Sequence, residues 1–304
     1  MNQSALVNRV APCHGSAADR NEVLKRRTKL WVYLAVGPLV GFMLLRWFEQ
    51  SQIYRPSREA DCHPADFQLP VEDVTLTARD GVRLHGWWIP APVNSPRRQL
   101  AVLFCHGNGG NLTSRPGYYQ AIRETGVNLF TFDYRGYGRS AGSPGEAGTY
   151  LDAHAAYAWL RARGFAGGDI ILWGESLGGG IASELALHEP VGGLVLQSSF
   201  TSIPDLGGEV FPWLPVRLIA TIQYDTVRRL PRIHVPVLIL HSRQDELIGF
   251  HHAEKNFAAA NEPKLLWELR GGHNEALDAD RPRFVAGFEE FLRQSEERRG
   301  ARSD

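Results

Sequence analysis

Three residues in the second half of the chain have the types and the order of a nucleophile, an acid and a base. Ser176 stands in the pentapeptide Gly-Glu-Ser-Leu-Gly (174–178), between the apolar run 169–173 and a segment that favours a helix. A serine at such a strand-to-helix turn exposes its hydroxyl, and the helix behind it directs free backbone N–H groups toward an oxyanion. The pentapeptide alone is a weak signal. Its position between strand and helix is what predicts a nucleophile at Ser176 rather than a plain tight turn.

A serine nucleophile needs a base, and the base needs an acid that orients it. His273 follows two glycines after the apolar run 264–269, and Asp245 follows the run 235–240. The chain order Ser176, Asp245, His273 is the order expected when the serine occupies this kind of turn. We therefore predict His273 as the base and Asp245 as the acid. A surface loop histidine and a helix N-cap aspartate are the alternatives.

A tetrahedral intermediate also needs backbone donors for its oxyanion. The residue after the nucleophile, Leu177, supplies one backbone N–H. The second is expected from the glycine-rich loop 106–111, which follows the apolar run 100–105. We predict the N–H groups of Leu177 and Asn108 as the two donors, with Gly107 or Gly109 as the nearest alternatives to Asn108.

Three further polar residues lie beside these motifs. Asp133 also follows an apolar run and competes for the role of the acid, but it precedes the serine in the chain. We expect it to hold the loop 134–140 by hydrogen bonds. His106 is expected to shape the oxyanion loop, and Glu175 to be a solvated or hydrogen-bonded neighbour of the nucleophile.

Other residue types exclude several classes of site. The 33 basic and 33 acidic residues give a net charge of +0, so the chain lacks the basic surplus of a nucleic-acid binder. Its 3 cysteines have no zinc-binding spacing and are too few for a disulfide scaffold, and Cys105 is expected to be a buried small hydrophobe. Four histidines invite a metal interpretation, but no carboxylate or cysteine completes a ligand set in the sequence, so no metal site is predicted. These histidines are His234, His241, His251 and His252.

The elements that must position the site follow from short apolar runs after residue 70. Segments 71–78 and 82–90 flank a turn at Asp80-Gly81 and predict a β-hairpin. Six dense apolar runs follow, separated by segments that favour helices, such as 150–163 and 283–297. Strands this apolar are covered on both faces, so we predict an α/β domain with an eight-stranded, mostly parallel sheet flanked by helices. The predicted catalytic domain spans 70–297, and residues 298–304 are expected to fray.

A small lid is predicted over about 200–233, between two of the runs. It contains Phe211, Trp213, Leu214 and Ile219, which suit an acyl-chain site or contact with lipid. The alternative is an amphipathic helix that packs on the sheet.

A different kind of segment precedes the domain. Residues 30–48 are apolar apart from Arg46, near the roughly 20 residues needed to cross a bilayer core. We predict a transmembrane anchor here, against the alternatives of a buried core helix or a cleaved signal peptide. By the positive-inside rule, residues 1–29 are expected to be cytoplasmic, 49–69 a linker, and the catalytic domain extracytoplasmic. The basic residues before the span are Arg9, Arg20, Lys25, Arg26, Arg27 and Lys29, and those at or beyond its far end are Arg46, Arg55 and Arg58.

These motifs together are similar to those of a known family. The sequence resembles the α/β-hydrolase superfamily, in the branch that contains serine-aminopeptidase-like hydrolases and membrane-associated proteins related to eukaryotic depalmitoylating thioesterases. The motifs that carry the resemblance are FCHGNGGN (104–111), FDYRGYGRSAGSPGE (132–146), ILWGESLGG (171–179), LQSSFTSIPDL (196–206), LILHSRQDELI (238–248) and GGHNE (271–275).

The resemblance implies the α/β-hydrolase fold and a serine hydrolase that acts on esters, thioesters or amides without a cofactor. It implies Ser176 as nucleophile, Asp245 as acid and His273 as base. This resemblance and the predicted anchor together lead us to expect a membrane-anchored enzyme that cleaves ester or thioester bonds of a small or lipid-like acyl substrate. The alternatives are a peptidase of the aminopeptidase kind and a non-catalytic, membrane-tethered binding protein.

Overall fold

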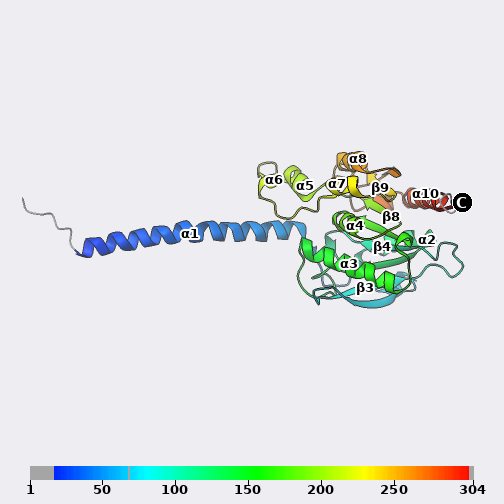
Figure 1. The fold of residues 1–304 in the computed structure, drawn as a ribbon, viewed down its shortest axis with the longest axis horizontal. Helices are drawn as coiled ribbons and strands as arrows, with labels where there is room; N and C mark the ends of the chain where they lie inside the picture. The colour runs from blue at the N-terminus through cyan, green and yellow to red at the C-terminus, as the bar shows by residue number, and fades with distance from the viewer. Residues whose placement is uncertain (1–16, 68, 301–304) are drawn as a thin grey trace, which may run out of the picture. The chain divides into compact units, whose positions relative to one another are not determined.

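The computed structural model describes residues 17–67 and 69–300. Within these ranges, the side chains of ten residues between 17 and 35, and of residues 299 and 300, lie outside the description. The chain divides into two compact units, Met1–Ser51 and Gln52–Asp304, each of which is considered by itself. The order of the elements can be followed by colour in Figure 1, from α1 in blue to α10 in red.

The first unit contains most of helix α1 (Ala17–Ile53), which continues through Pro38. Many of its large apolar side chains are exposed. They are Leu24, Trp31, Tyr33, Leu34, Val36, Leu39, Val40, Phe42, Met43, Leu44 and Trp47. Among the described residues, no helix combines the length and the apolarity needed to cross a membrane. Three side chains of the predicted span 30–48, those of Leu30, Val32 and Ala35, fall outside the described residues.

The second unit is built on an eight-stranded sheet with the order β10-β9-β8-β7-β4-β6-β3-β2. Only β3 runs against the other strands of this sheet, because its pairings with β2 and β6 are antiparallel and the rest are parallel. The predicted eight-stranded, mostly parallel sheet is therefore confirmed. The strands are β2 (Glu72–Thr77), β3 (Arg83–Ile89), β4 (Ala101–Cys105), β6 (Asn128–Phe132), β7 (Ile170–Glu175), β8 (Gly193–Gln197), β9 (Val237–Ser242) and β10 (Lys264–Leu269).

Helices cover both faces of this sheet, and alternate strand residues point to each face. In β4, Leu103 joins one core cluster with residues of α3, α4 and α8, whereas Phe104 joins a second cluster with residues of α2 and α10. Since the central strands are buried on both faces, their residues are apolar without alternation. The helices are α2 (Pro116–Glu124), α3 (Glu146–Ala162), α4 (Leu177–His188), α8 (Phe250–Ala259), α9 (Ala276–Ala279) and α10 (Arg281–Gly300), with 3-10 turns η1 (Pro64–Phe67), η2 (Leu112–Ser114), η3 (Gly167–Asp169) and η4 (Leu230–Arg232).

The segment predicted as a linker contributes a short strand. β1 (Arg55–Pro56) pairs in parallel with β5 (Gly109–Gly110), which belongs to the glycine-rich loop. Tyr54, just before β1, is buried and its hydroxyl lies 2.9 Å from that of Tyr224. Residues from Gln52 onward are therefore part of the same compact unit as the sheet.

The segment predicted as a lid forms three short helices. They are α5 (Ile203–Val210), α6 (Val216–Ile219) and α7 (Thr226–Arg229). Ser202 caps α5 by accepting a hydrogen bond from the Asp205 N–H at 3.1 Å. At the other end of the domain, α10 extends to Gly300, and the rest of the predicted tail, 301–304, lies outside the described residues.

Candidate active site

Ser176 occupies a strained turn between β7 and α4. Its φ of 51° and ψ of −113° lie in a region that costs a residue with a side chain about 1–3 kcal/mol. Two contacts hold this backbone: the Ser176 N–H donates to the Gln197 carbonyl at 2.8 Å, and the Ser199 hydroxyl donates to the Ser176 carbonyl at 2.9 Å. A Cβ on Gly178 would overlap the carbonyl oxygen of Cys105. The glycine therefore allows α4 to begin directly against the end of β4.

The structure brings Ser176, His273 and Asp245 together in a relay. His273 Nε2 lies 3.2 Å from the Ser176 hydroxyl oxygen, and His273 Nδ1 lies 2.7 Å from Asp245 Oδ2. The other carboxylate oxygen, Asp245 Oδ1, accepts hydrogen bonds from the N–H groups of Leu247 at 3.0 Å and Ile248 at 2.7 Å. Asp245 thus faces the histidine and also holds the turn after β9. It does not cap a helix, the alternative considered from the sequence, because α8 begins at Phe250 with Gly249 as its N-cap.

Contacts with Glu246 fix the loop that carries His273. The His273 backbone N–H donates to Glu246 Oε2 at 3.1 Å, and a Cβ on Gly272 would lie 2.7 Å from the same oxygen. Gly271 has a φ of +86°, which a residue with a side chain rarely adopts. The two glycines that precede His273 therefore let the chain turn after β10 and place the ring above the sheet edge.

The two predicted oxyanion donors line the same cleft as Ser176. Leu177 is the first residue of α4, so its N–H has no acceptor within the helix. Gly107 is excluded as the alternative donor, since its N–H already donates to Glu175 Oε2 at 3.1 Å. The carbonyl of Gly107 accepts from His106 Nδ1 at 2.7 Å. In the trans peptide between Gly107 and Asn108, the N–H of Asn108 points away from the Gly107 carbonyl and therefore away from His106.

The surroundings of His106 determine the charge of its ring and the nitrogen that carries the proton. The ring is fully buried, and burial, with Arg115 nearby, lowers the pKa of His106 to about 3. The imidazole is therefore neutral at physiological pH. Because a carbonyl oxygen only accepts, the contact with Gly107 assigns the ring proton to Nδ1. His106 shapes the loop, as the sequence predicted, and stands apart from proton transfer.

Glu175 is hydrogen-bonded, as expected, whereas the side chain of Asp133 holds a different loop from the predicted 134–140, which it contacts through its backbone carbonyl, an acceptor of the Ser140 hydroxyl at 2.7 Å. Asp133 Oδ1 accepts from the Leu112 N–H at 2.7 Å and is buried under the loop rather than beside His273. Glu175 accepts from Gly107 and also from Arg115 Nε at 2.6 Å. Arg115 was missed from the sequence. It lies just before α2, and nothing in its local motif indicates that it pairs with the residue next to the nucleophile.

A cleft of ≈ 670 Å³ opens above Ser176. Its lining combines apolar residues, mainly from α5 and its ends, with charged residues that include Arg55, Asp61 and Arg115. The apolar lining residues are Ile53, Phe200, Ile203, Leu206, Val210, Phe211, Leu247 and Ile248. Of the four apolar residues singled out in the lid, Phe211 lines the cleft; among the described residues Trp213 is largely exposed and is not part of its lining.

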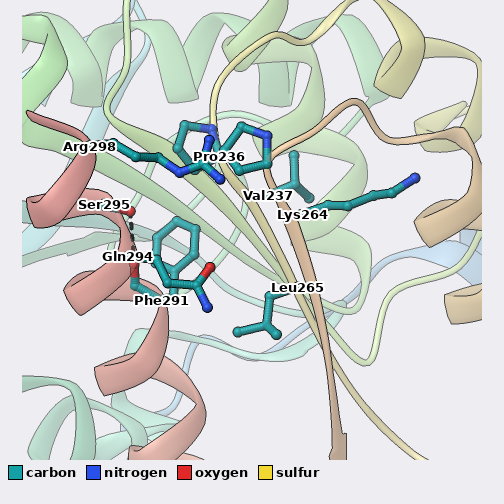
Figure 2. A pocket seen from close by; sticks show the side chains of 9 residues that line it. Pro236, Val237, Lys264, Leu265, Phe291, Gln294, Ser295 and Arg298 are labelled. Atoms are coloured by element: carbon teal, nitrogen blue, oxygen red, sulfur yellow. Dashed lines mark hydrogen bonds between the residues drawn. The ribbon is translucent and has the colours of Figure 1, made fainter. Parts of the chain in front are cut away.

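A second crevice lies away from these residues. Figure 2 shows it between β9, β10 and α10, beside Phe291, Gln294 and Arg298. Its volume is ≈ 10 Å³, about one water molecule, and no candidate catalytic residue lines it. It has no bearing on the chemistry.

Two of the four histidines belong to a cluster that the sequence did not reveal. Glu209, on α5, meets His251 and His252, at the start of α8, and one potential ligand atom from each residue lies within 4.8 Å of the other two. A carboxylate therefore does lie beside two of these histidines, and the sequence did not reveal it because it comes from a helix more than forty residues earlier. Of the others, His241 donates to the Ile248 carbonyl at 2.7 Å, and His234 contacts Asn261.

Comparisons with known proteins agree with this fold. A profile of the alpha/beta hydrolase fold matches residues 101–218. An uncharacterized protein of Mycobacterium tuberculosis is 34% identical over 89% of this chain and 97% of its own length. The alpha/beta hydrolase domain-containing protein WAV2 of Arabidopsis thaliana is 32% identical over 73% of this chain and 79% of its own. A Pyrococcus furiosus esterase structure superposes with a TM-score of 0.67 at 21% identity, covering 80% of this chain and 98% of that one, which shows a shared fold.

Proposed function

The chain belongs to the α/β-hydrolase family, and from this premise we propose that it is a serine hydrolase that cleaves carboxylic ester or thioester bonds. The observation that carries the proposal is the relay of 3.2 Å and 2.7 Å that joins Ser176, His273 and Asp245. These distances are within the reach of a nucleophile and base pair and of the acid that orients the base.

The reaction follows from the positions of these atoms. His273 Nε2 accepts the proton of the Ser176 hydroxyl as its oxygen attacks the acyl carbonyl, while Asp245 stabilises the imidazolium through Nδ1–H. The N–H groups of Leu177 and Asn108 stabilise the oxyanion of the tetrahedral intermediate. His273 then gives the proton to the departing alcohol or thiol. Water repeats the sequence on the acyl-enzyme and releases the carboxylic acid.

The lining of the cleft supports an apolar acyl group. The apolar side chains of Leu206, Val210 and Phe211, from the α5 region, line the cleft, so an alkyl chain is stabilised there by removal from water. Charged side chains, among them Arg55 and Asp61, line the same cleft and suit a polar leaving group. Esters or thioesters of a lipid-like acid match this lining of the cleft.

Membrane attachment is part of the proposal and rests on the sequence. Residues 30–48 contain one charged residue, Arg46, and are preceded by a basic segment, which supports an anchor with a cytoplasmic N-terminus and an extracytoplasmic hydrolase domain. The exposed apolar side chains of α1 are consistent with this role. Protease added outside intact spheroplasts is expected to digest the domain after residue 52. A domain that stays intact until the membrane is permeabilised would contradict this orientation.

The enzymatic proposal is tested with p-nitrophenyl esters of increasing acyl length and the detergent-solubilised full chain. We expect hydrolysis that Ser176→Ala and His273→Ala each reduce by at least about 10³-fold. Rates of the variants equal to that of the wild type would contradict the mechanism. A folded wild type without activity on any ester would favour the non-catalytic binding protein.

A further inference from the structure

The second cluster of chemistry-bearing side chains lies outside the triad. His251 Nε2 is 2.9 Å from Glu209 Oε1, and His252 Nε2 is 3.2 Å from Glu209 Oε2. The two imidazole rings lie 4.4 Å apart between centroids, and one ligand atom from each of the three residues lies within 4.8 Å of the other two. Two imidazole nitrogens and a carboxylate thus converge from two different elements, α5 and α8.

The spacing of these atoms suits a divalent transition metal. Ligand atoms about 2.0–2.1 Å from a tetrahedral Zn²⁺ lie roughly 3.3–3.4 Å from one another. The distances from His251 Nε2 and His252 Nε2 to the Glu209 carboxylate oxygens, 2.9 and 3.2 Å, are slightly shorter than this ligand spacing, as expected where hydrogen bonds join the same atoms without an ion. Two histidines and one carboxylate also form a donor set that zinc accepts, with the remaining position open to water because Glu209 is exposed.

The residues around the cluster hold the two rings in place. A Cβ on Gly249 would lie 2.7 Å from His251 Nδ1, so the glycine leaves room for that ring. His252 is fully buried, and its Nδ1 lies 2.9 Å from the Thr201 hydroxyl oxygen, which in turn donates to Asp205 at 3.0 Å. The Thr201 backbone N–H also donates to His252 Nδ1 at 3.2 Å, which places the ring proton on Nε2 while Nε2 faces Glu209 without an ion. Metal binding at Nε2 therefore requires this proton to move to Nδ1, with the Thr201 hydroxyl as its acceptor in place of the contact with the N–H. Outer partners of this kind orient metal-bound histidines.

We propose that Glu209, His251 and His252 bind one divalent cation of the zinc class and that the ion ties α5 to α8. The neighbouring face of α5 supplies Leu206 and Val210 to the apolar wall of the cleft. A bound ion therefore fixes the wall against which the proposed acyl chain lies. Lys255, also on α8, adds positive charge near His252 and reduces the affinity below that of a site with acidic surroundings.

The test uses the untagged full chain in detergent, titrated with Zn²⁺ by calorimetry in the Ser176→Ala background. We expect one ion per chain, with affinity reduced at least about 10-fold in Glu209→Gln and in His251→Ala. His273→Ala and His188→Ala, at histidines outside the cluster, are expected to bind as the parent does. No binding by the parent, or identical titration of all variants, would overturn the proposal.

A second measurement tests the link between the two helices. Zn²⁺ is expected to slow amide hydrogen exchange in α5 of the parent and to leave exchange in Glu209→Gln unchanged. Protection of α5 that persists in Glu209→Gln would place the ion elsewhere and overturn the proposal. Because the Ser176→Ala background lacks the proposed nucleophile, neither the zinc titration nor the hydrogen-exchange result depends on whether the proposed hydrolysis occurs.

Discussion

At the scale of single residues, the peptides on both sides of Asn108 are held by hydrogen bonds from neighbouring groups. His106 Nδ1 donates to the Gly107 carbonyl at 2.7 Å, and the next carbonyl, that of Asn108, accepts from the Arg55 N–H at 3.1 Å and the Tyr137 hydroxyl at 2.8 Å. Donors that are fixed before the reaction stabilise a developing oxyanion without a cost of reorientation. In the proposed mechanism we therefore assign His106 as a positioning residue for the Asn108 N–H.

This role predicts a specific kinetic effect. His106→Ala removes the donor to the Gly107 carbonyl, so kcat is expected to fall by about 10²-fold with a smaller change in KM. His106→Asn, which keeps an N–H donor, is expected to recover part of the loss. Steady-state kinetics on a short ester, with thermal unfolding measured in parallel, checks this.

The matched control is Tyr134→Phe. The Tyr134 hydroxyl donates to the His106 carbonyl at 2.8 Å, one peptide before the one that joins Gly107 to Asn108. Its loss is expected to lower stability without the fall in kcat. Equal losses of kcat in the alanine, asparagine and Tyr134→Phe variants would assign His106 a role in packing alone.

Sequence reasoning found the residues that follow strand ends and missed those that pair across the fold. Ser176, Asp245 and His273 each follow an apolar run, and in a parallel sheet the ends of such runs meet at one edge. Arg115 pairs with Glu175 across 60 positions, and Glu209 meets His252 across 43. Neither contact follows from local pattern, because each depends on how a helix is placed on the sheet.

At the scale of elements, α5 determines one wall of the cleft. Leu206 lines the cleft, whereas Leu218 on α6 is 87% exposed and does not belong to its lining. Leu206→Ala is expected to lower kcat/KM for an eight-carbon acyl ester by about 10-fold and to leave a two-carbon ester unchanged, because only the longer chain reaches this contact. Leu218→Ala is expected to alter neither. A uniform loss across chain lengths in Leu206→Ala would argue against an acyl-binding wall.

The contact between α3 and the end of α4 predicts a dependence of stability on pH. His154 on α3 lies 3.5 Å from Glu184 and 3.1 Å from Glu189, and the hydrogen bond to Glu184 is the main cause that raises the pKa of His154. Because the pKa of His154 is raised in the folded state, its protonation stabilises the fold. This contribution is fully present at a pH below the ordinary histidine value of 6.5 and is lost as the pH rises through the raised pKa.

Denaturant unfolding of His154→Gln measures this contribution. The variant is expected to be less stable than the wild type by up to about 1 kcal/mol near pH 5.5, with a smaller difference near pH 9. His234→Gln, at an exposed histidine that contacts the Asn261 amide, serves as the control. A difference that grows with pH would contradict the assigned sign.

At the scale of the whole molecule, the boundary between the two units lies just before residues that the active site needs. The unit that begins at Gln52 includes Tyr54 and the β1 strand, which pairs with the oxyanion loop. A chain that starts at Gln52 is expected to keep the full-length kcat/KM on a soluble ester. A chain that starts at Arg58 loses the pairing and is expected to fall by at least about 10-fold. Equal activities of the two truncations would contradict the role of β1.

Length, composition and apolar runs were sufficient to predict the sheet and its helical layers. In β4, alternate residues belong to the core clusters on the two faces of the sheet. Because both clusters are apolar, every residue of such a strand is apolar, and the strand is recognisable as an apolar run. The pairing of Arg55 with the loop at Gly109 could not be predicted, because two-residue strands leave no periodic pattern. A similar limit applies to the short helices between 203 and 229.

The central claim is that Ser176 is activated by His273. The most direct test is labelling by a fluorophosphonate probe in membranes, comparing the wild type with Ser176→Ala, His273→Ala and Ser114→Ala, the last at another serine that lines the cleft. We predict that the wild type and Ser114→Ala are labelled and that the other two are not. Labelling of Ser176→Ala, or undiminished labelling of His273→Ala, would contradict the proposed mechanism.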